Sequence, residues 1–199
     1  MTTIRLTRYF LINSDDYHDP SFVPVYDDSG NIIATVSAHF FADCSLEGSG
    51  RLSDGRVINV TGHYVACPQN VAMALKQIAD MMYRSRYSYV GLTNDCSHYF
   101  TYKVSPEPWG LGSHGNPLLP FAVVASDPHY YPYGTVLFAP QLQGLQLPNQ
   151  GTHDGYLYCG DTGGAIKGPN HCDWFVGIKA WQLNHIVPDY IDIEVYKTP

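Results

Sequence analysis

The chain has 199 residues, a length that fits one medium-sized domain better than two independent domains. Hydrophobic residues make up 45% of it, which is close to the globular average and excludes disorder as the main state. Charged residues make up only 15%, and 11 Lys and Arg against 18 Asp and Glu leave a net charge of −7, so nucleic acid is not an expected partner.

The N-terminal residues MTTIRLTRYFLINSDD lack the apolar segment of a secretion signal. No apolar run approaches the roughly 18 residues needed to cross a bilayer, so we expect no membrane span. Three interpretations of the missing signal stay open. A leader has been removed, the protein stays inside the cell, or it leaves by a route that reads no N-terminal signal.

Short strands and turns are expected in the first third of the chain. Alternating apolar and polar residues predict a strand over 4–11. Residues 22–26 and 32–41 flank the turn 27–31 and predict a hairpin. A further turn and strand are expected over 52–60.

One helix is expected after Pro68, because proline suits the first helical position and apolar residues then recur at helical spacing. Its expected span is 69–84. Prolines and glycines interrupt any helical or strand-like spacing of apolar residues over 86–120, so we interpret this segment as an irregular loop excursion. Long ordered loops often build binding clefts, and the residues that would line one here are Trp109, His114 and Asn116.

Strands are expected again at 121–125, 135–139, 155–159 and within 186–196. Strands therefore precede and follow one helix, which favours a mainly β fold over a repeating βαβ series. We expect a single domain over 1–199, with barrel strands at about 1–66 and 118–197. The helix and loop over 67–117 would form an insertion.

The five cysteines match no metal-binding spacing, so no metal is expected. Small buried thiols in a mostly reduced protein are the first interpretation. The alternative is one disulfide bond, for which Cys159 and Cys172 are the most plausible pair because they bracket a glycine-rich turn.

Three aspartates, Asp127, Asp161 and Asp173, each stand at the edge of an apolar segment. A carboxylate is costly in such a place unless it is paired or used. Gly163 and Gly164 follow Asp161 closely and allow a substrate chain or a neighbouring strand to approach the backbone.

The motifs around these aspartates read VASDP (124–128), YPYGT (131–135), DTGGAIKG (161–168) and DWFVG (173–177). Together they resemble the three-aspartate (3D) domain of the membrane-bound lytic transglycosylase A group and of stationary-phase survival proteins of Gram-positive bacteria. The resemblance covers about 121–177, and Thr7-x-Tyr9 resembles the opening strand of that family.

The resemblance implies a double-psi β-barrel that needs no cofactor and cuts peptidoglycan glycan strands between N-acetylmuramic acid and N-acetylglucosamine. In this reaction the C6 hydroxyl of the muramyl sugar attacks its own C1, which leaves a 1,6-anhydro end. The family's acid/base aspartate falls on Asp173, which would act first as general acid and then as base. Asp161 and Asp127 match the other two family aspartates and would keep the site polar and Asp173 protonated.

Seven further residues are candidates for substrate binding. Lys167 would contact substrate or stabilise developing charge, Tyr133 and Thr135 would shape the wall of a cleft, and His153 would contact sugar or fix a loop. Trp174 would add apolar surface beside Asp173. The full set is Lys167, Gly163, Gly164, Tyr133, Thr135, His153 and Trp174.

Two other functions fit the same residues. An inverting glycoside hydrolase on the same barrel would use two carboxylates and water, and a non-catalytic module of the expansin kind would only bind the cell wall. If the chain cuts peptidoglycan, it acts in the periplasm or cell wall. Without a leader it would arrive by a specialised secretion system or by lysis, as an antibacterial effector with a cognate immunity protein in the first case.

Overall fold

The computed structural model describes residues 1–68, 71–73, 75, 99–148, 150–178 and 190–198. These residues form two compact units. The barrel unit comprises Met1–Phe10 and Leu111–Pro199, and the α/β unit comprises Leu11–Gly110. We expected a single domain, and each compact unit is described by itself.

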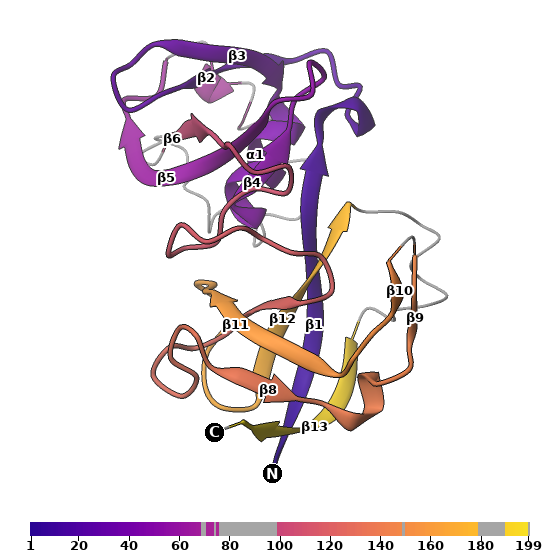
Figure 1. The fold of residues 1–199 in the computed structure, drawn as a ribbon. Helices are drawn as coiled ribbons and strands as arrows, with labels where there is room; N and C mark the ends of the chain where they lie inside the picture. Colours follow the sequence, from indigo (N-terminus) through magenta and orange to yellow (C-terminus); the bar gives the residue numbers. More distant parts are fainter. Residues whose placement is uncertain (69–70, 74, 76–98, 149, 179–189, 199) are drawn as a thin grey trace. The chain divides into compact units, whose positions relative to one another are not determined.

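Six strands form the barrel unit, in the order β12-β7-β11-β8-β13-β1, and pairing of β12 with β1 closes the sheet on itself. β1 pairs antiparallel with β13, whereas β7 and β11 run parallel. In Figure 1 the indigo β1 lies beside β12 and β13, although these strands come from opposite ends of the chain. Their bounds are β1 Thr2–Asn13, β7 Val123–Ala125, β8 Val136–Phe138, β11 Tyr156–Asp161, β12 His171–Ile178 and β13 Tyr190–Lys197.

The barrel core follows from the alternation of side chains along these strands. Leu137 and Leu157 are fully buried while their strand neighbours are partly or well exposed, as expected when successive residues point to opposite faces. Ile4, Leu6, Val124, Trp174, Ile193 and Val195 complete the apolar interior together with Cys159 and Cys172. The mainly β fold with a barrel is confirmed.

Smaller elements complete the barrel unit. β9 (Gln146–Leu147) and β10 (Gly151–Thr152) form a short hairpin, and η2 (Pro140–Leu142) is a single 3-10 turn. No helix within the described residues is long and apolar enough to span a membrane.

Three cysteines follow the first interpretation of the sequence. Cys159 and Cys172 are both free and buried in the barrel core, and Cys44 is free and buried as well. The alternative, a Cys159–Cys172 bond, is not formed, and both thiols pack as small apolar groups. Cys67 is disulfide-bonded, and its partner lies outside the described residues.

The α/β unit holds the strands that we expected to complete the barrel, so the assignment of residues 1–66 to barrel strands is wrong beyond β1. A three-stranded sheet, β4-β5-β6, pairs with the end of β1 through Ile12 and Gly50, and β2 and β3 form a separate hairpin. The elements are η1 Ser14–Asp16, β2 Phe22–Tyr26, β3 Ile32–Ser37, α1 Ala38–Glu47, β4 Ser49–Arg51, β5 Val57–Val65 and β6 Tyr99–Val104.

Helix α1 replaces the second half of the strand expected over 32–41. Ser37 ends β3 and caps the helix, because its side chain accepts a hydrogen bond from the backbone N–H of Phe40. Gly48 ends the helix in a left-handed conformation, and its N–H donates to the carbonyl of Cys44. Ser37 and Gly48 flank the ten residues of this helix. They are the capping signals for a helix, which the strand-like pattern of the segment obscured.

Most of the helix expected over 69–84 lies outside the described residues, although 71–73 and 75 are helical. The expected irregular segment 86–120 is only partly described. Its first part, 86–98, lies outside the description, and residues 99–104 form β6 instead of loop. The irregular part is therefore confined to 105–120 within the described residues.

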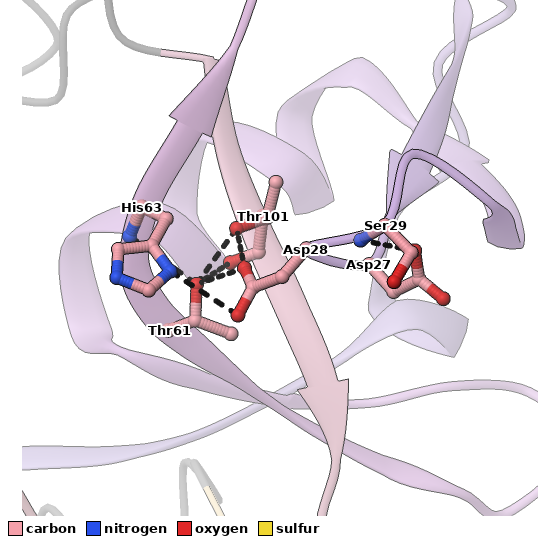
Figure 2. A network of polar contacts seen from close by, with 6 residues as sticks. All are labelled: Asp27, Asp28, Ser29, Thr61, His63 and Thr101. Carbon is pink, nitrogen blue, oxygen red and sulfur yellow. Dashed lines mark hydrogen bonds and ion pairs between the residues drawn. The ribbon is translucent and has the colours of Figure 1, made fainter.

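A polar network fastens the β2–β3 turn to the sheet of the α/β unit (Figure 2). Asp28 accepts hydrogen bonds from the hydroxyls of Thr101 and Thr61, and its other oxygen lies 3.2 Å from Nδ1 of His63. The bonds from Thr101 and Thr61 are the main reasons why the pKa of Asp28 is below its usual value. The carboxylate thus ties the turn to β5 and β6.

Candidate active site

Asp173 lies on β12 in an environment that favours its neutral form. Burial, and to a smaller extent the negative charge of Asp161, raise the pKa of its carboxyl group to about 6. The hydroxyl of Thr7 on β1 opposes this shift by donating to Oδ1 of Asp173 over 2.9 Å. Since Thr7 occupies Oδ1, the acid proton belongs on Oδ2, which has no hydrogen-bond partner within the described residues.

Asp161, at the end of β11, is held by hydrogen bonds on both oxygens. The backbone N–H groups of Ser113 and Thr162 donate to Oδ1 over 2.9 and 2.8 Å, and the hydroxyl of Tyr9 donates to Oδ2 over 2.8 Å. All three donors stabilise negative charge on the carboxylate. Asp161 is therefore a fixed anion beside Asp173.

The sheet places these two carboxylates on either side of one small residue. Asp161 on β11 and Asp173 on β12 both pair with Ala125, because β7 lies between their strands. Neighbouring strands are about 4.8 Å apart, so the two backbones are separated by about 10 Å. That arrangement explains why the charge of Asp161 acts on Asp173 without a direct hydrogen bond.

Two glycines let Asp161 reach its donors. The β11–β7 register shifts at Gly160, so Asp161 does not follow the buried Cys159 into the core. A side chain at Gly112 would come within 2.4 Å of the carbonyl oxygen of Gly160. Only glycine allows this close approach, which brings the N–H of Ser113 to Asp161.

Asp127 has a structural environment. Its two oxygens accept from the backbone N–H groups of His129 and Gly168 over 3.0 and 2.9 Å, and these bonds lower its pKa. No hydrogen bond or charge interaction joins Asp127 to Asp173 among the described residues. The expectation that Asp127 keeps Asp173 protonated is therefore corrected. Together with Asp161, it fastens the two ends of the glycine-rich loop.

A hydrogen-bonded chain leads from His171 to Asp173. Nε2 of His171 lies 2.8 Å from Oγ1 of Thr7. Because the single hydroxyl proton of Thr7 is directed to the Asp173 carboxylate, Nε2 of His171 is the donor in this contact. Burial lowers the pKa of His171, so the histidine is neutral when it donates to Thr7.

The structure groups some of the expected substrate-binding residues near Asp161. The ring of Tyr133 stacks on His114 at 4.4 Å and lies edge-on to Tyr158 at 5.8 Å, and His114 is next to the donor Ser113. His114 was expected to line a cleft, and Tyr133 to form its wall. Trp109, expected beside them, belongs to the α/β unit, where Arg51 lies over its ring.

The glycine-rich loop carries three of the remaining candidates. A side chain at Gly163 would meet the buried Ile166 at 2.8 Å, so this glycine is needed for the packing of the loop. Gly164 and Lys167 are exposed, and the charge of Lys167 acts on Asp127. Thr135 is half-buried, and its carbonyl accepts from the N–H of Cys159.

His153 and Trp174 are buried away from solvent, with exposed fractions of 4% and 1%. Nδ1 of His153 accepts from the N–H of Gly155, and Nε2 donates to the carbonyl of Phe121, which has a φ of 63°. His153 thus fixes this strained loop, which is one of the two roles expected for it. Trp174 packs against Phe121 and His153 in the core, so the structure places it in the barrel interior.

The sequence did not identify three of the hydrogen-bond donors to Asp161 and Asp173, which are Thr7, Tyr9 and Ser113. Thr7-x-Tyr9 had been noticed only as a resemblance, and two residues of that spacing share one face of a strand. Ser113 acts through its backbone, for which no sequence signal exists. No group of three or more His, Cys, Asp or Glu side chains suited to a metal ion occurs in the described part of the chain.

Comparison with known proteins shows a family match over part of the chain. Residues 122–185 match the family model of the 3D domain. The match contains Asp127, Asp161 and Asp173, so the resemblance noted in the sequence is confirmed for this segment. No curated protein matches the sequence.

Solved structures show a similar fold over nearly the whole chain, including the part outside the 3D domain. Escherichia coli MltA with bound chitohexaose is 20% identical with a TM-score of 0.56, over 99% of this chain and 72% of that one. A membrane-bound lytic murein transglycosylase from Agrobacterium tumefaciens is 16% identical with a TM-score of 0.57, over 97% and 73%. At these identities the similarity shows the fold.

Proposed function

We propose that the protein is a lytic transglycosylase that cuts peptidoglycan glycan strands, with Asp173 as its acid and base. The observation that carries the proposal is the raised pKa of Asp173, about 6, at the acid/base position of a 3D domain. A carboxyl group with that pKa is neutral often enough near neutral pH to donate a proton. The Agrobacterium tumefaciens structure with this fold, a membrane-bound lytic murein transglycosylase, supports the reaction class.

The reaction needs one carboxyl group that changes its protonation state. The neutral Asp173 gives its Oδ2 proton to the glycosidic oxygen as the bond to C1 breaks. The resulting carboxylate then removes the proton of the C6 hydroxyl while O6 bonds to C1. The proton returns to Asp173, and the products are a new hydroxyl end and a 1,6-anhydro end.

The surroundings of Asp161 favour this reaction over hydrolysis by an inverting enzyme. An inverting glycosidase needs a second carboxylate that activates water. Asp161 accepts hydrogen bonds from two backbone N–H groups and one tyrosine hydroxyl, so most of its acceptor sites are already used by protein donors. Asp161 is therefore suited to stabilise charge and to tune Asp173.

The product of the wild-type protein tests the proposal. We expect digestion of purified peptidoglycan to release fragments that carry anhydro ends, which mass spectrometry identifies by the absence of one water. Fragments with reducing ends would show hydrolysis instead. Binding without any fragment would indicate a wall-binding module of the expansin kind.

We also expect a pH dependence that follows the protonation of Asp173. Because the acid form is needed, kcat/KM should fall about tenfold per pH unit above a pH of about 6. Asp161→Asn removes a negative charge that raises the pKa of Asp173, so the fall should begin at lower pH. Asp127→Asn serves as the control, and an equal displacement in both variants would contradict the assigned role of Asp161.

The disulfide at Cys67 supports a site of action in the periplasm or cell wall, because disulfides persist in oxidising compartments. Peptidoglycan is exposed in the same compartment. The delivery route and the immunity protein expected for an antibacterial effector stay predictions.

A further inference from the structure

A row of aromatic side chains crosses three neighbouring strands of the barrel. Phe138 on β8 pairs directly with Tyr156 on β11 and with Tyr196 on β13. β8 lies between these two strands (Figure 1), and directly paired residues project from the same face of a sheet. Tyr156, Phe138 and Tyr196 therefore form an aromatic row at the strand spacing of about 4.8 Å.

The row faces solvent. Leu137, Leu157 and Val195 are the strand neighbours of its members, and all three are buried in the core, so the aromatic residues point outward. Tyr156 and Tyr196 are 47% and 41% exposed. Phe138 is half-buried and contacts the ring of Tyr156 at a centroid distance of 5.0 Å. The hydroxyl of Tyr196 donates a hydrogen bond to the sulfur of Met1.

Hollows border the row at both ends. Beyond Tyr156 lies one of about 290 Å³, whose rim includes Thr152 and Asp154. Beyond Tyr196 lies one of about 450 Å³, lined also by Tyr130 and Lys197. The aromatic row thus continues into two hollows that carry hydroxyl groups and charges of both signs.

The row is separate from the candidate active site. Tyr156 begins β11, whereas Asp161 ends it, which puts about 16 Å between their backbones. Met1, whose sulfur contacts Tyr196, precedes Thr7 by six residues, or about 20 Å of extended chain. Both measures separate the aromatic row from the candidate active site along the barrel strands.

We propose that this aromatic row, with its two hollows, is an accessory binding platform for a polysaccharide strand, distinct from the cleavage site. Flat rings offer the apolar faces of successive sugars a stacking surface, and tyrosine hydroxyls, Asp154 and Lys197 offer hydrogen bonds to their hydroxyl and carboxylate groups. The choice of peptidoglycan as ligand rests on the proposed function. The platform would hold the protein on the insoluble polymer while Asp173 acts elsewhere on it.

Sedimentation with insoluble peptidoglycan tests the platform. In an Asp173→Asn background, which prevents cleavage, Tyr156→Ala combined with Tyr196→Ala should weaken binding by at least about tenfold, because two stacking surfaces are lost. Tyr156→Phe combined with Tyr196→Phe keeps the rings and should bind within about threefold of the parent. Tyr190→Ala is the matched control, since Tyr190 is 59% exposed on the same strand as Tyr196, and its binding should be unchanged. Circular dichroism of each variant checks that it is folded.

Equal binding by the double alanine variant and the Tyr190→Ala control would overturn the platform. So would a dimer of the parent that dissociates only in the double alanine variant, because the row would then be a contact between copies of this chain. Product analysis of the wild-type protein stays independent of this result. If anhydro fragments are released but binding does not depend on the two tyrosines, the proposed function stands and the platform is overturned. If binding depends on the tyrosines but no fragments are released, the platform stands and the proposed function is overturned.

Discussion

Replacing Asp173 by Asn is expected to reduce glycan cleavage by about 10²–10⁴-fold, the usual contribution of a general acid or base. The upper end applies here, because one carboxyl group serves both proton transfers in the proposed reaction. Asparagine keeps the shape of the side chain and accepts the hydrogen bond from Thr7, so the fold should persist. The measurement is the initial rate of release of anhydro fragments from purified peptidoglycan.

Asp192→Asn is the control for this loss, because Asp192 is an exposed aspartate of the same barrel, paired only loosely with Arg5 at 3.4 Å. Its cleavage rate should equal that of the wild type. Asp127→Asn should lose less than Asp173→Asn, since Asp127 fastens a loop and does not contact Asp173. Full activity of Asp173→Asn would remove this residue from the mechanism.

The same Asp173→Asn variant is expected to be more stable than the wild type at pH 8, by up to about 3 kcal/mol. The pKa of Asp173 is about 6 when folded and near 3.8 when unfolded, a difference of about two pKa units at 1.36 kcal/mol each. A raised folded pKa gives a contribution that is fully present below pH 3.8 and is lost as the pH rises through 6. At pH 8 the wild type therefore buries a carboxylate, which asparagine avoids.

Urea unfolding at pH 4 and pH 8 measures this effect. The gain should be large at pH 8 and shrink toward zero at pH 4, where the buried carboxyl group is protonated. Asp192→Asn should show no comparable difference between the two pH values. A gain of equal size at both pH values would mean that asparagine stabilises the barrel for reasons unrelated to charge. Residues that serve function commonly cost stability in this way.

The sequence predicted five of the six barrel strands, whereas β12 (His171–Ile178) was not expected as a strand. In β13 the buried Ile193 and Val195 alternate with polar residues, a pattern of period two that needs no tertiary information. The resemblance also pointed to Asp173 as the acid/base candidate and to the glycine-rich loop next to Asp161. Where local patterns compete, prediction failed: residues 38–41 fit a strand as well as a helix, and the cap at Ser37 decided the outcome.

The partners of the aspartates were beyond local reasoning. Thr7 and Asp173 are 166 residues apart in the chain, and only the pairing of β1 with β12 brings them together. The N–H of Ser113 reaches Asp161 through the approach of Gly112 to Gly160, which is a property of two backbones. The division into units was equally hidden, because β1 contributes residues to both of them.

Closure of the barrel by β1 and β12 has a consequence for the making of the protein. During synthesis Thr7 leaves the ribosome well before Asp173, because the two residues are 166 positions apart in the chain. Until both strands meet, Asp173 lacks the burial that favours its proton, so a nascent or truncated chain has no assembled acid. Contacts of such long sequence separation also form slowly. The environment of the proposed acid is therefore assembled late, when the barrel closes.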